Sequence, residues 1–447
     1  MSDRGAPKAP WLDRLGLHRP ELRAWALYDV ANSAWMTTIL LIFPLYFVNV
    51  AAGGMRADAA RSRFAFVTSL SVILVGLIAP VLGTMADLRG KKKGYLGAFL
   101  GLGAAATAAM YWITEGRWLL ALLCFVIGNV GVTSTLAFYN ALLPGIAGAD
   151  EVDRVSTAGF ALGYLGGGLL LALNALLIAN PALLGLPDKN AAIRLSFLSV
   201  AVWWVLFSIP LFLKVKEPAR RRETGEESKD GLLRVALRRL VVTLRELRRH
   251  KDAGLLLLAF LVYNDGINTI IRMATTFGDE IGIPQAHMIG ALLVVQLVGI
   301  PFSFAFGLLA SHIGAKRAIV LALVVYCGIA VYSYTLRTST QFFVLAFLVG
   351  TVQGGAQGLS RSLFATLIPT HKAGEMFGFF GVFDRFGGAL GSLLFGLTLS
   401  VTGSSRPAIL SLIVLFLLGG FLLTRVDVER GRRVAEEENS RARAIAR

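Results

Sequence analysis

The stretch GTMADLRGKKKG (Gly83–Gly94) closes one long apolar run and precedes another, with one acidic and four basic side chains in the turn between them. Apolar runs of about 20 residues, the length that crosses a bilayer as a helix, lie on both sides of it and recur along the chain. A related stretch, GLLASHIGAKRA (Gly307–Ala318), lies in the second half, and its two glycines repeat the spacing of Gly83 and Gly90. This internal similarity predicts a chain built from two related halves.

Hydropathy predicts an all-α membrane protein with twelve transmembrane helices in two pseudo-symmetric six-helix bundles. Apolar residues make up 55% of the 447 positions and charged residues 16%, whereas a soluble domain carries roughly 25% charged residues. The expected spans are Ala24–Val50, Phe64–Ala86, Tyr95–Thr114, Trp118–Leu142, Val155–Ala179, Ala191–Leu213, Ala253–Gly278, His287–Ser311, Ala318–Leu336, Phe342–Ile368, Met376–Thr402 and Ala408–Thr424.

Five segments follow from these spans. Residues 1–23 are expected to be a cytoplasmic N-terminal segment, 24–213 the first bundle, 214–252 a cytoplasmic linker, 253–424 the second bundle and 425–447 a cytoplasmic tail. The second part of the linker repeats leucine and arginine at helical spacing, which predicts an amphipathic basic helix, either on the anionic leaflet or packed between the halves. The tail is charged and lacks apolar periodicity, so we expect it to be mobile.

The net charge of +16 is distributed in a way that favours one orientation. With both termini cytoplasmic, about three quarters of the 44 Lys and Arg residues fall on the cytoplasmic side, the bias typical of inner-membrane proteins. Membrane lipids therefore account for the charge, and no nucleic-acid partner is expected. The polar segment Met1–Arg23 is not a signal peptide. We expect a monomer in the cell's inner (plasma) membrane. Cys124 and Cys327 lie in apolar runs, and neither a metal site nor a cofactor is indicated.

The turn that contains Gly83, Asp87, Gly90 and Lys91 resembles the corresponding loop of the major facilitator superfamily. Gly90 would permit a tight turn, and Asp87 could interact with a helix N-terminus of the other half, where the helix dipole favours an anion. These residues are candidates for a conformational switch. Alternatively, the lysines serve only membrane topology. The second copy has Ser311 in place of Asp87, so a charged latch there is expected to be weaker or absent.

A narrower resemblance covers most of the chain. Five blocks in the same order are similar to the vacuolar-effluxer family, which is linked to autophagy and has bacterial members. The resemblance implies the major facilitator fold and, from the fungal members, release of amino acids. The blocks are WALYDVANSAW (Trp25–Trp35), YNALLP (Tyr139–Pro144), ALGYLGGG (Ala161–Gly168), YNDGINTII (Tyr263–Ile271) and GGAQGLSRSLFATLIP (Gly354–Pro369).

Polar residues within the predicted spans need partners or a water-filled cavity, because a charge in mid-membrane costs roughly 2.5–3.5 kcal/mol. Asp29 and Asn32 share one helix face, and so do Asp265 and Asn268, with Arg272 two turns beyond Asp265. The tenth span carries a polar stripe at helical spacing. The candidate substrate-binding or coupling residues are Asp29, Asn32, Tyr263, Asp265, Asn268, Arg272, Gln353, Gln357 and Arg361.

These residue types suit an amino acid, since arginine offers a two-point contact to a carboxylate, and an aspartate can hold an ammonium group or a coupled proton. The alternative is that the charges pair with one another and hold the halves together. For Asp384 and Arg385 that structural alternative is favoured. For Arg272 we consider either a ligand or a partner across the cavity such as Asp29. The small-residue pattern of Gly159, Gly163 and Gly167 predicts helix packing.

The function expected from these features is secondary active transport by alternating access, most simply export of amino acids or similar small polar metabolites. Proton coupling follows from the buried carboxylates alone. Other cargo, namely drugs, peptides or lipids, fits the same fold. A membrane-embedded enzyme or a transporter-like sensor is the alternative of another class, but we do not expect an enzyme, because the five histidines fall near helix ends or in loops. No phosphate-binding loop that would indicate ATP use occurs.

Overall fold

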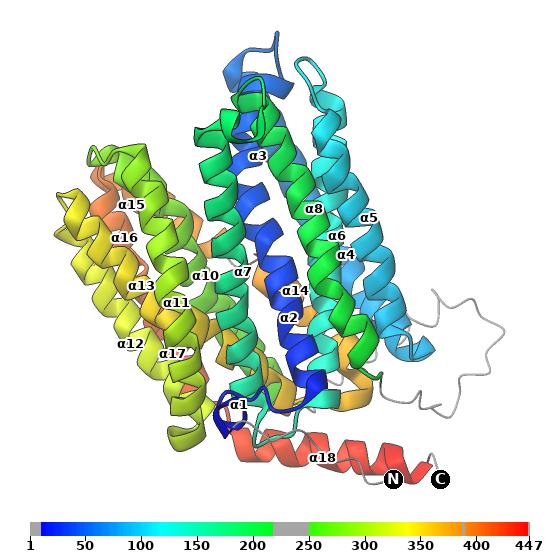
Figure 1. The fold of residues 1–447 in the computed structure, drawn as a ribbon. Helices are drawn as coiled ribbons and strands as arrows, with labels where there is room; N and C mark the ends of the chain where they lie inside the picture. The colour runs from blue at the N-terminus through cyan, green and yellow to red at the C-terminus, as the bar shows by residue number, and fades with distance from the viewer. Residues whose placement is uncertain (1–9, 218–249, 387–388, 446–447) are drawn as a thin grey trace.

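Long helices make up nearly all of the structure, a computed structural model that describes residues 10–217, 250–386 and 389–445 (Figure 1). Eleven helices of the described chain are long and apolar enough to cross a membrane. The remaining crossing is shared by α14 (Ala373–Phe386) and α15 (Ala389–Thr402), which flank residues 387–388. The expected all-α fold of twelve membrane helices is confirmed. The amphipathic helix expected in the linker falls in 218–249, outside the described residues.

The membrane helices extend a few residues beyond the predicted spans at most ends. The first crossing joins α2 (Pro20–Ala34), π-helical Trp35–Ile39, α3 (Leu40–Tyr46) and π-helical Phe47–Ala51. The others are α4 (Ala57–Arg89), α5 (Lys92–Ala109), α6 (Trp118–Ile146), α7 (Val152–Ala179), α8 (Lys189–Lys214), α10 (Lys251–Glu280), α11 (Gln285–Ile313), α12 (Ala315–Tyr334), α13 (Ser339–Thr366), and α16 (Ser405–Ser411) with α17 (Ile413–Thr424). Outside the crossings lie α1 (Pro10–Arg14) and α18 (Val428–Ile445).

Each repeated stretch has a glycine with positive φ between its two helices. Gly90 follows α4 with φ of 61°, and Gly314 follows α11 with φ of 85°. Positive φ is a conformation that glycine adopts without steric cost. The turns differ in ψ, which is 34° at Gly90 and 147° at Gly314, so the shared glycine spacing corresponds to a positive-φ glycine in both halves but not to the same turn.

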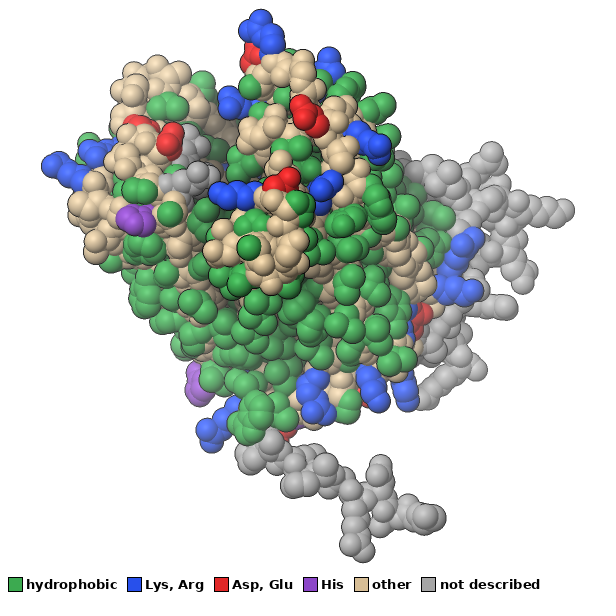
Figure 2. All heavy atoms as spheres, turned by 45° about the horizontal axis from the view of Figure 1, so that its top comes forward, with side chains coloured by type: hydrophobic (Ala, Val, Ile, Leu, Met, Phe, Trp, Pro, Cys, Tyr) green, Lys and Arg blue, Asp and Glu red, His purple; other side chains and the backbone are tan. Residues whose placement is uncertain are grey.

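The helices bury small residues against one another and turn large apolar residues outward. On α7, a Cβ at Gly166 would lie 2.4 Å from Cγ1 of Val30, and one at Gly163 would lie 2.6 Å from Oγ of Ser33, so the predicted packing face lies against α2. Leu165 and Leu169, on the same helix, are about half exposed. Hydrophobic side chains cover the middle of the face in view, and charged ones gather near its two ends (Figure 2). This distribution fits a protein surrounded by lipid.

The two halves stand side by side, and the hydrogen bonds between their described residues gather at one end. Among the described residues, every hydrogen bond between the halves involves the α18-side ends of α2, α4, α6, α7, α13 and α14. Figure 1 shows α18 running beneath this end. We call it the joined end. The distribution of Lys and Arg predicts that it faces the cytoplasm.

The C-terminal tail is a docked helix, so the expectation of a mobile segment was wrong for Val428–Ile445. Near its start, Arg430 forms a two-point ion pair with Asp252 of α10, with both N–O distances at 2.8 Å. Further along, Oδ1 of Asn439 accepts hydrogen bonds from the backbone N–H and the hydroxyl of Thr370, each at 2.9 Å. The helix is therefore held by individual polar contacts.

Glu438 of α18 gathers three basic groups. Its carboxylate lies 2.7 Å from Nζ of Lys372, 3.0 Å from Nε2 of His250 and 3.5 Å from Nε2 of His371. Partial burial alone would raise the pKa of Glu438, but its bonds to these three groups hold that pKa well below its usual range. Since a depressed carboxyl pKa stabilises the docked state until the pH falls through it, the Glu438 contribution persists across physiological pH.

Candidate functional site

A buried ion pair joins the two halves inside the membrane region. Oδ2 of Asp29, on α2, accepts hydrogen bonds from Nη2 of Arg361 on α13 at 3.1 Å and from the hydroxyl of Tyr139 on α6 at 2.9 Å. Asp29 is 6% exposed and Arg361 is 3% exposed. Both belong to the predicted candidate set, and the structure brings them together although they lie far apart in the sequence.

The Arg361 guanidinium has several partners besides Asp29. Its Nε donates to Oγ of Ser156 at 2.8 Å, and Nη2 donates to the Ser156 carbonyl at 2.7 Å. The same group lies 4.5 Å from the ring centre of Phe160 and 4.8 Å from that of Trp25, within the range of cation–π attraction. In this conformation Arg361 is therefore part of the contact between the halves, and its donors are not turned toward a ligand.

Gly159 makes room for this ion pair, a role that sequence reasoning missed. A Cβ at this position would lie 2.4 Å from Oδ2 of Asp29 and 2.9 Å from Nη2 of Arg361. The pattern Gly159–Gly163–Gly167 predicted packing only. Gly163 does pack against α2, but Gly159, one turn nearer the joined end, faces the charges.

Arg272 does not pair with Asp29, so that expected partnership is wrong for this conformation. Arg272 is exposed, and within the described part of the chain it has no ion pair or hydrogen bond. Asp29 is occupied by Arg361 and Tyr139. Contact with a ligand, the other alternative for Arg272, stays a prediction.

Asp265 lies within the second bundle, against α15. It is fully buried, and its Oδ2 accepts a hydrogen bond from the backbone N–H of Gly391 at 3.0 Å. The hydroxyl of Thr269, one turn along α10, lies 3.5 Å from the other carboxylate oxygen. Asp265 therefore joins α10 to α15 inside one half, a setting quite different from that of Asp29.

A second polar cluster, around Asn264, was missed in the sequence. Its Nδ2 donates to Oδ1 of Asp384 at 2.8 Å, and its Oδ1 accepts from Nε2 of Gln357 at 3.4 Å. Asn264, Asn268 and Arg272 follow at intervals of four residues, and they are buried, partly exposed and exposed in that order. This spacing of four residues is visible in the sequence and places all three side chains on one face of α10. The side chain of Arg385 lies outside the described residues.

The other candidates lie around these clusters. The hydroxyl of Tyr263 is 2.6 Å from Oγ of Ser360 on α13. Oδ1 of Asn32 is buried with no hydrogen-bond partner among the described residues. Gln353 is partly exposed, one turn from Gln357 on α13. Asn32, Asn268, Gln353 and Arg272 thus offer polar groups that the described structure leaves available.

Asp87 lies against a helix N-terminus of the other half. Its two carboxylate oxygens accept hydrogen bonds from the backbone N–H groups of Gly374 at 3.1 Å and Glu375 at 2.8 Å, at the start of α14. A Cβ at Gly83 would lie 2.2 Å from the Gly374 carbonyl oxygen, so only glycine permits this approach of α4 to α14. The geometry is the one expected from the sequence.

The lysine in this arrangement differs from the expected one. Nζ of Lys92 lies 2.9 Å from Oδ1 of Asp87, whereas Lys91 is exposed. At the second copy of the stretch, the Ser311 hydroxyl donates to the Leu308 carbonyl of its own helix, and the described residues show no bond from it to the other half. The absence of a charged latch there agrees with the replacement of aspartate by serine.

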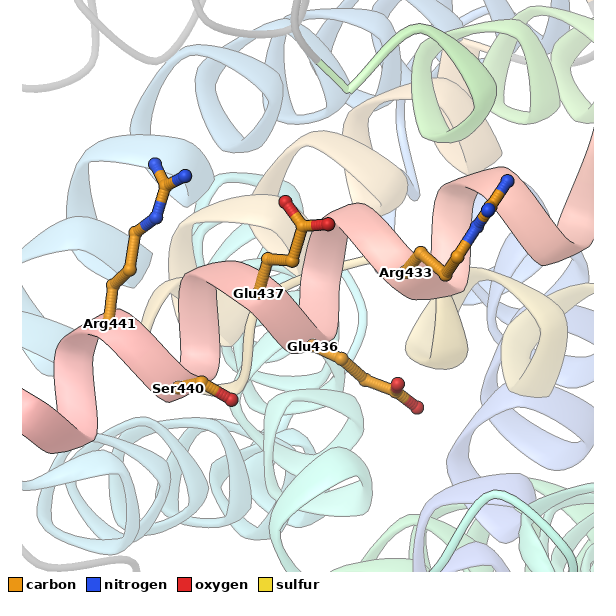
Figure 3. Close-up of a pocket in the computed structure, with 5 residues that line it drawn as sticks. All are labelled: Arg433, Glu436, Glu437, Ser440 and Arg441. Atoms are coloured by element: carbon orange, nitrogen blue, oxygen red, sulfur yellow. The ribbon is translucent and has the colours of Figure 1, made fainter.

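One surface pocket lies apart from these groups (Figure 3). It has a volume of about 400 Å³ and is lined entirely by residues of α18, namely Arg433, Glu436, Glu437, Ser440 and Arg441. Its mixed acidic and basic lining carries no feature that selects one ligand. The candidate site is therefore the set of intramembrane polar residues.

Comparison with known proteins adds relatives along the whole chain. The profile of the family described as "Vacuole effluxer Atg22 like" matches residues 18–436. Over 420 residues the chain is 35% identical to the uncharacterized MFS-type transporter YxiO of Bacillus subtilis (strain 168), covering 93% of this chain and 97% of that one. It is 26% identical to autophagy-related protein 22 of Yarrowia lipolytica (strain CLIB 122 / E 150), covering 82% and 76%. The solved structure of XylE, a proton:xylose symporter of the major facilitator superfamily, matches with a TM-score of 0.68 at 14% identity, covering 98% and 100%.

Proposed function

The chain belongs to the Atg22-like vacuole effluxer family of the major facilitator superfamily, and we propose that it is a secondary active transporter that exports amino acids or similar small polar metabolites by alternating access. The family's description as vacuole effluxers supports export, and amino-acid cargo is what the resemblance to the fungal members implies. We place the protein in the inner (plasma) membrane with both termini cytoplasmic, as the distribution of Lys and Arg predicts.

One observation carries the proposal. Hydrogen bonds between the halves, among the described residues, lie at the joined end only, in the Asp87 latch and around Arg361. Two halves that are fastened at one end can open there and close at the other without unfolding either bundle. This is the movement that alternating access requires, and we assign the Asp87 latch and the Asp29–Arg361 pair to the conformation closed toward the cytoplasm.

We propose that the cargo contacts one face of α10, which carries Asn268 and Arg272, and Gln353 of α13. Arg272 would bind a carboxylate of the cargo, and Asn268 and Gln353 would bind its other polar groups. Asp265 would carry the coupled proton, since it is a carboxylate fully buried within the membrane region. Drugs, peptides or lipids remain the alternative cargo.

The proton assignment is tested by Asp265→Asn. The amide oxygen can still accept the Gly391 N–H, so we expect the fold to persist while the titrating group is lost. In proteoliposomes loaded with the twenty amino acids, efflux driven by a pH gradient should fall at least tenfold, whereas exchange of labelled for unlabelled amino acid should continue. Retention of gradient-driven efflux at the parent rate would rule Asp265 out as the proton carrier.

The carboxylate contact is tested by Arg272→Lys. An ammonium group cannot reproduce the two-point contact of a guanidinium, so we expect the exchange assay to show an apparent affinity at least tenfold weaker. Arg337→Lys, at another exposed arginine, is the matched control and should leave the affinity unchanged. Equal affinities for the two variants would remove Arg272 from the binding site.

A further inference from the structure

Tyr164 of the N-terminal half inserts its ring into the C-terminal half. A Cβ at Gly299 of α11 would lie 2.8 Å from Cδ2 of this ring, and a Cβ at Gly354 of α13 would lie 2.6 Å from Cε2. Both distances are shorter than real Cβ contacts allow, so the Cδ2–Cε2 edge of the ring lies directly against both glycines. We call the space between these two glycines the glycine slot.

The glycine slot belongs to a longer contact between the halves. Toward the joined end, a Cβ at Gly307 of α11 would lie 2.1 Å from Oγ1 of Thr157. Toward the other end, a Cβ at Gly168 would lie 3.1 Å from Cβ of Gln296. Along this contact, the side chains of Thr157 and Tyr164 each meet a glycine on both α11 and α13, and Tyr164 is the one that contributes a ring. When α7 separates from α11, the Tyr164 ring must therefore leave the slot, unless α11 and α13 move together with α7.

The two ends of the tyrosine side chain have opposite preferences. The ring is buried among apolar and backbone atoms, which favours insertion. The hydroxyl of Tyr164 is buried without a hydrogen-bond partner among the described residues, and so is Oγ of Ser303, which is 1% exposed. Burying an unpaired hydroxyl opposes insertion. Because the two contributions are of similar size, small chemical changes at Tyr164 should shift the balance between conformations.

We propose that Tyr164 is a positioning residue of the transport cycle, which stabilises the conformation closed at the joined end while its ring occupies the glycine slot and leaves the slot when that end opens. The inference rests on the proposed alternating access but not on the identity of the cargo. The tyrosine ring stabilises the closed state, and its buried, unpaired hydroxyl limits how stable that state becomes.

The test measures the distance between the halves without cargo. Spin labels replace exposed Lys91 and His312, which lie at the joined end in different halves, in a chain carrying Cys124→Ser and Cys327→Ser. Double electron–electron resonance in lipid nanodiscs measures the distance between the two labels and so reports the closed and open populations. Asp87→Asn is included throughout, because weakening the latch should populate both states.

Gly299→Ala should raise the ratio of open to closed molecules at least tenfold, because its nearest contacts are atoms of the Tyr164 ring. Tyr164→Ala alone should also raise the ratio, because it removes the ring from the slot, and adding Gly299→Ala to it should cause little further change, since there is no ring left to clash with. Tyr164→Phe should act in the opposite direction and lower the ratio roughly tenfold, the effect of no longer burying an unpaired hydroxyl. The last variant keeps the test valid if Gly299→Ala fails to fold.

Gly350→Ala is the matched control. Gly350 is one turn from Gly354 on α13, but its Cβ would meet Val298 of the same half, at 2.9 Å from Cβ. Its substitution should lower thermal stability without changing the ratio of open to closed, and Tyr164→Ala should not rescue it.

Two results would overturn the inference and leave the transporter proposal intact: a Gly299→Ala substitution that shifts the ratio as much in the Tyr164→Ala protein as in the parent, or a Tyr164→Phe variant that opens the joined end. A single distance population in every variant would instead overturn alternating access itself, and this inference with it.

Discussion

Replacing Arg361 with alanine is expected to lower the free energy of unfolding by about 3–5 kcal/mol and to open the joined end. The substitution leaves the Asp29 carboxylate buried with only the Tyr139 hydroxyl as a partner, and it also removes the bonds to Ser156. An uncompensated charge in low dielectric costs far more than the pair contributes when intact. Denaturant unfolding of the purified protein in detergent, followed by tryptophan fluorescence, measures the change.

Two variants show whether the charge is responsible. Asp29→Asn added to Arg361→Ala should recover a large part of the loss, because the buried group becomes neutral and can still accept from Tyr139. Arg56→Ala breaks the exposed pair with Asp58 and should change stability by less than about 1 kcal/mol. If Arg361→Ala costs no more than Arg56→Ala, the buried pair does not hold the halves together.

The parts of the fold that depend on local pattern could be predicted from the sequence. Lipid selects helices by length and apolar content, so the spans followed from hydropathy to within a few residues. The environment of Asp87 followed as well, because a repeated turn fixes where the carboxylate lies and a helix N-terminus is a general partner for an anion. Which lysine pairs with Asp87 was harder to predict. Lys91 and Lys92 are adjacent, and the direction in which α5 leaves the turn decides which of them faces the carboxylate.

Partners across the two halves could not be predicted in the same way. Helical spacing shows which residues share a face, but not which face of another helix lies opposite. Asp29 therefore had two plausible cationic partners, and the choice of Arg361 depends on how α13 approaches α2 in this conformation. The expectation about Arg272 used spacing within one helix, which carries no information about depth in the other half.

Individual contacts between residues distant in sequence were also beyond pattern reading. Asp265 accepts the backbone N–H of Gly391 on the eleventh crossing, and hydropathy does not indicate which residues meet in this way. The tail lacks an apolar stripe, and α18 is held by separate ion pairs of Arg430 and Glu438. Such pairs join residues distant in sequence and leave no periodic signal.

Replacing Asp87 with asparagine should shift the protein toward the conformation open at the joined end. The amide oxygen can accept one backbone N–H at most, and the ion pair with Lys92 is lost. Hydrogen bonds to a charged group contribute about 1.5–3 kcal/mol, so we expect the ratio of open to closed molecules to rise roughly thirtyfold. The measurement is the distance between labels at positions 91 and 312.

Transport and binding should respond differently to this substitution. Asp87 contacts backbone of α14 and Lys92, and none of the candidate cargo residues, so equilibrium binding should stay within a few-fold while net efflux slows. Ser311→Ala, at the matching position of the other half, removes only a bond within its own helix and should change neither quantity. Loss of binding in a folded Asp87→Asn protein would place Asp87 in the cargo site. An unchanged conformational ratio would mean that the close approach of Gly83 to Gly374 holds α4 against α14 without help from the charge.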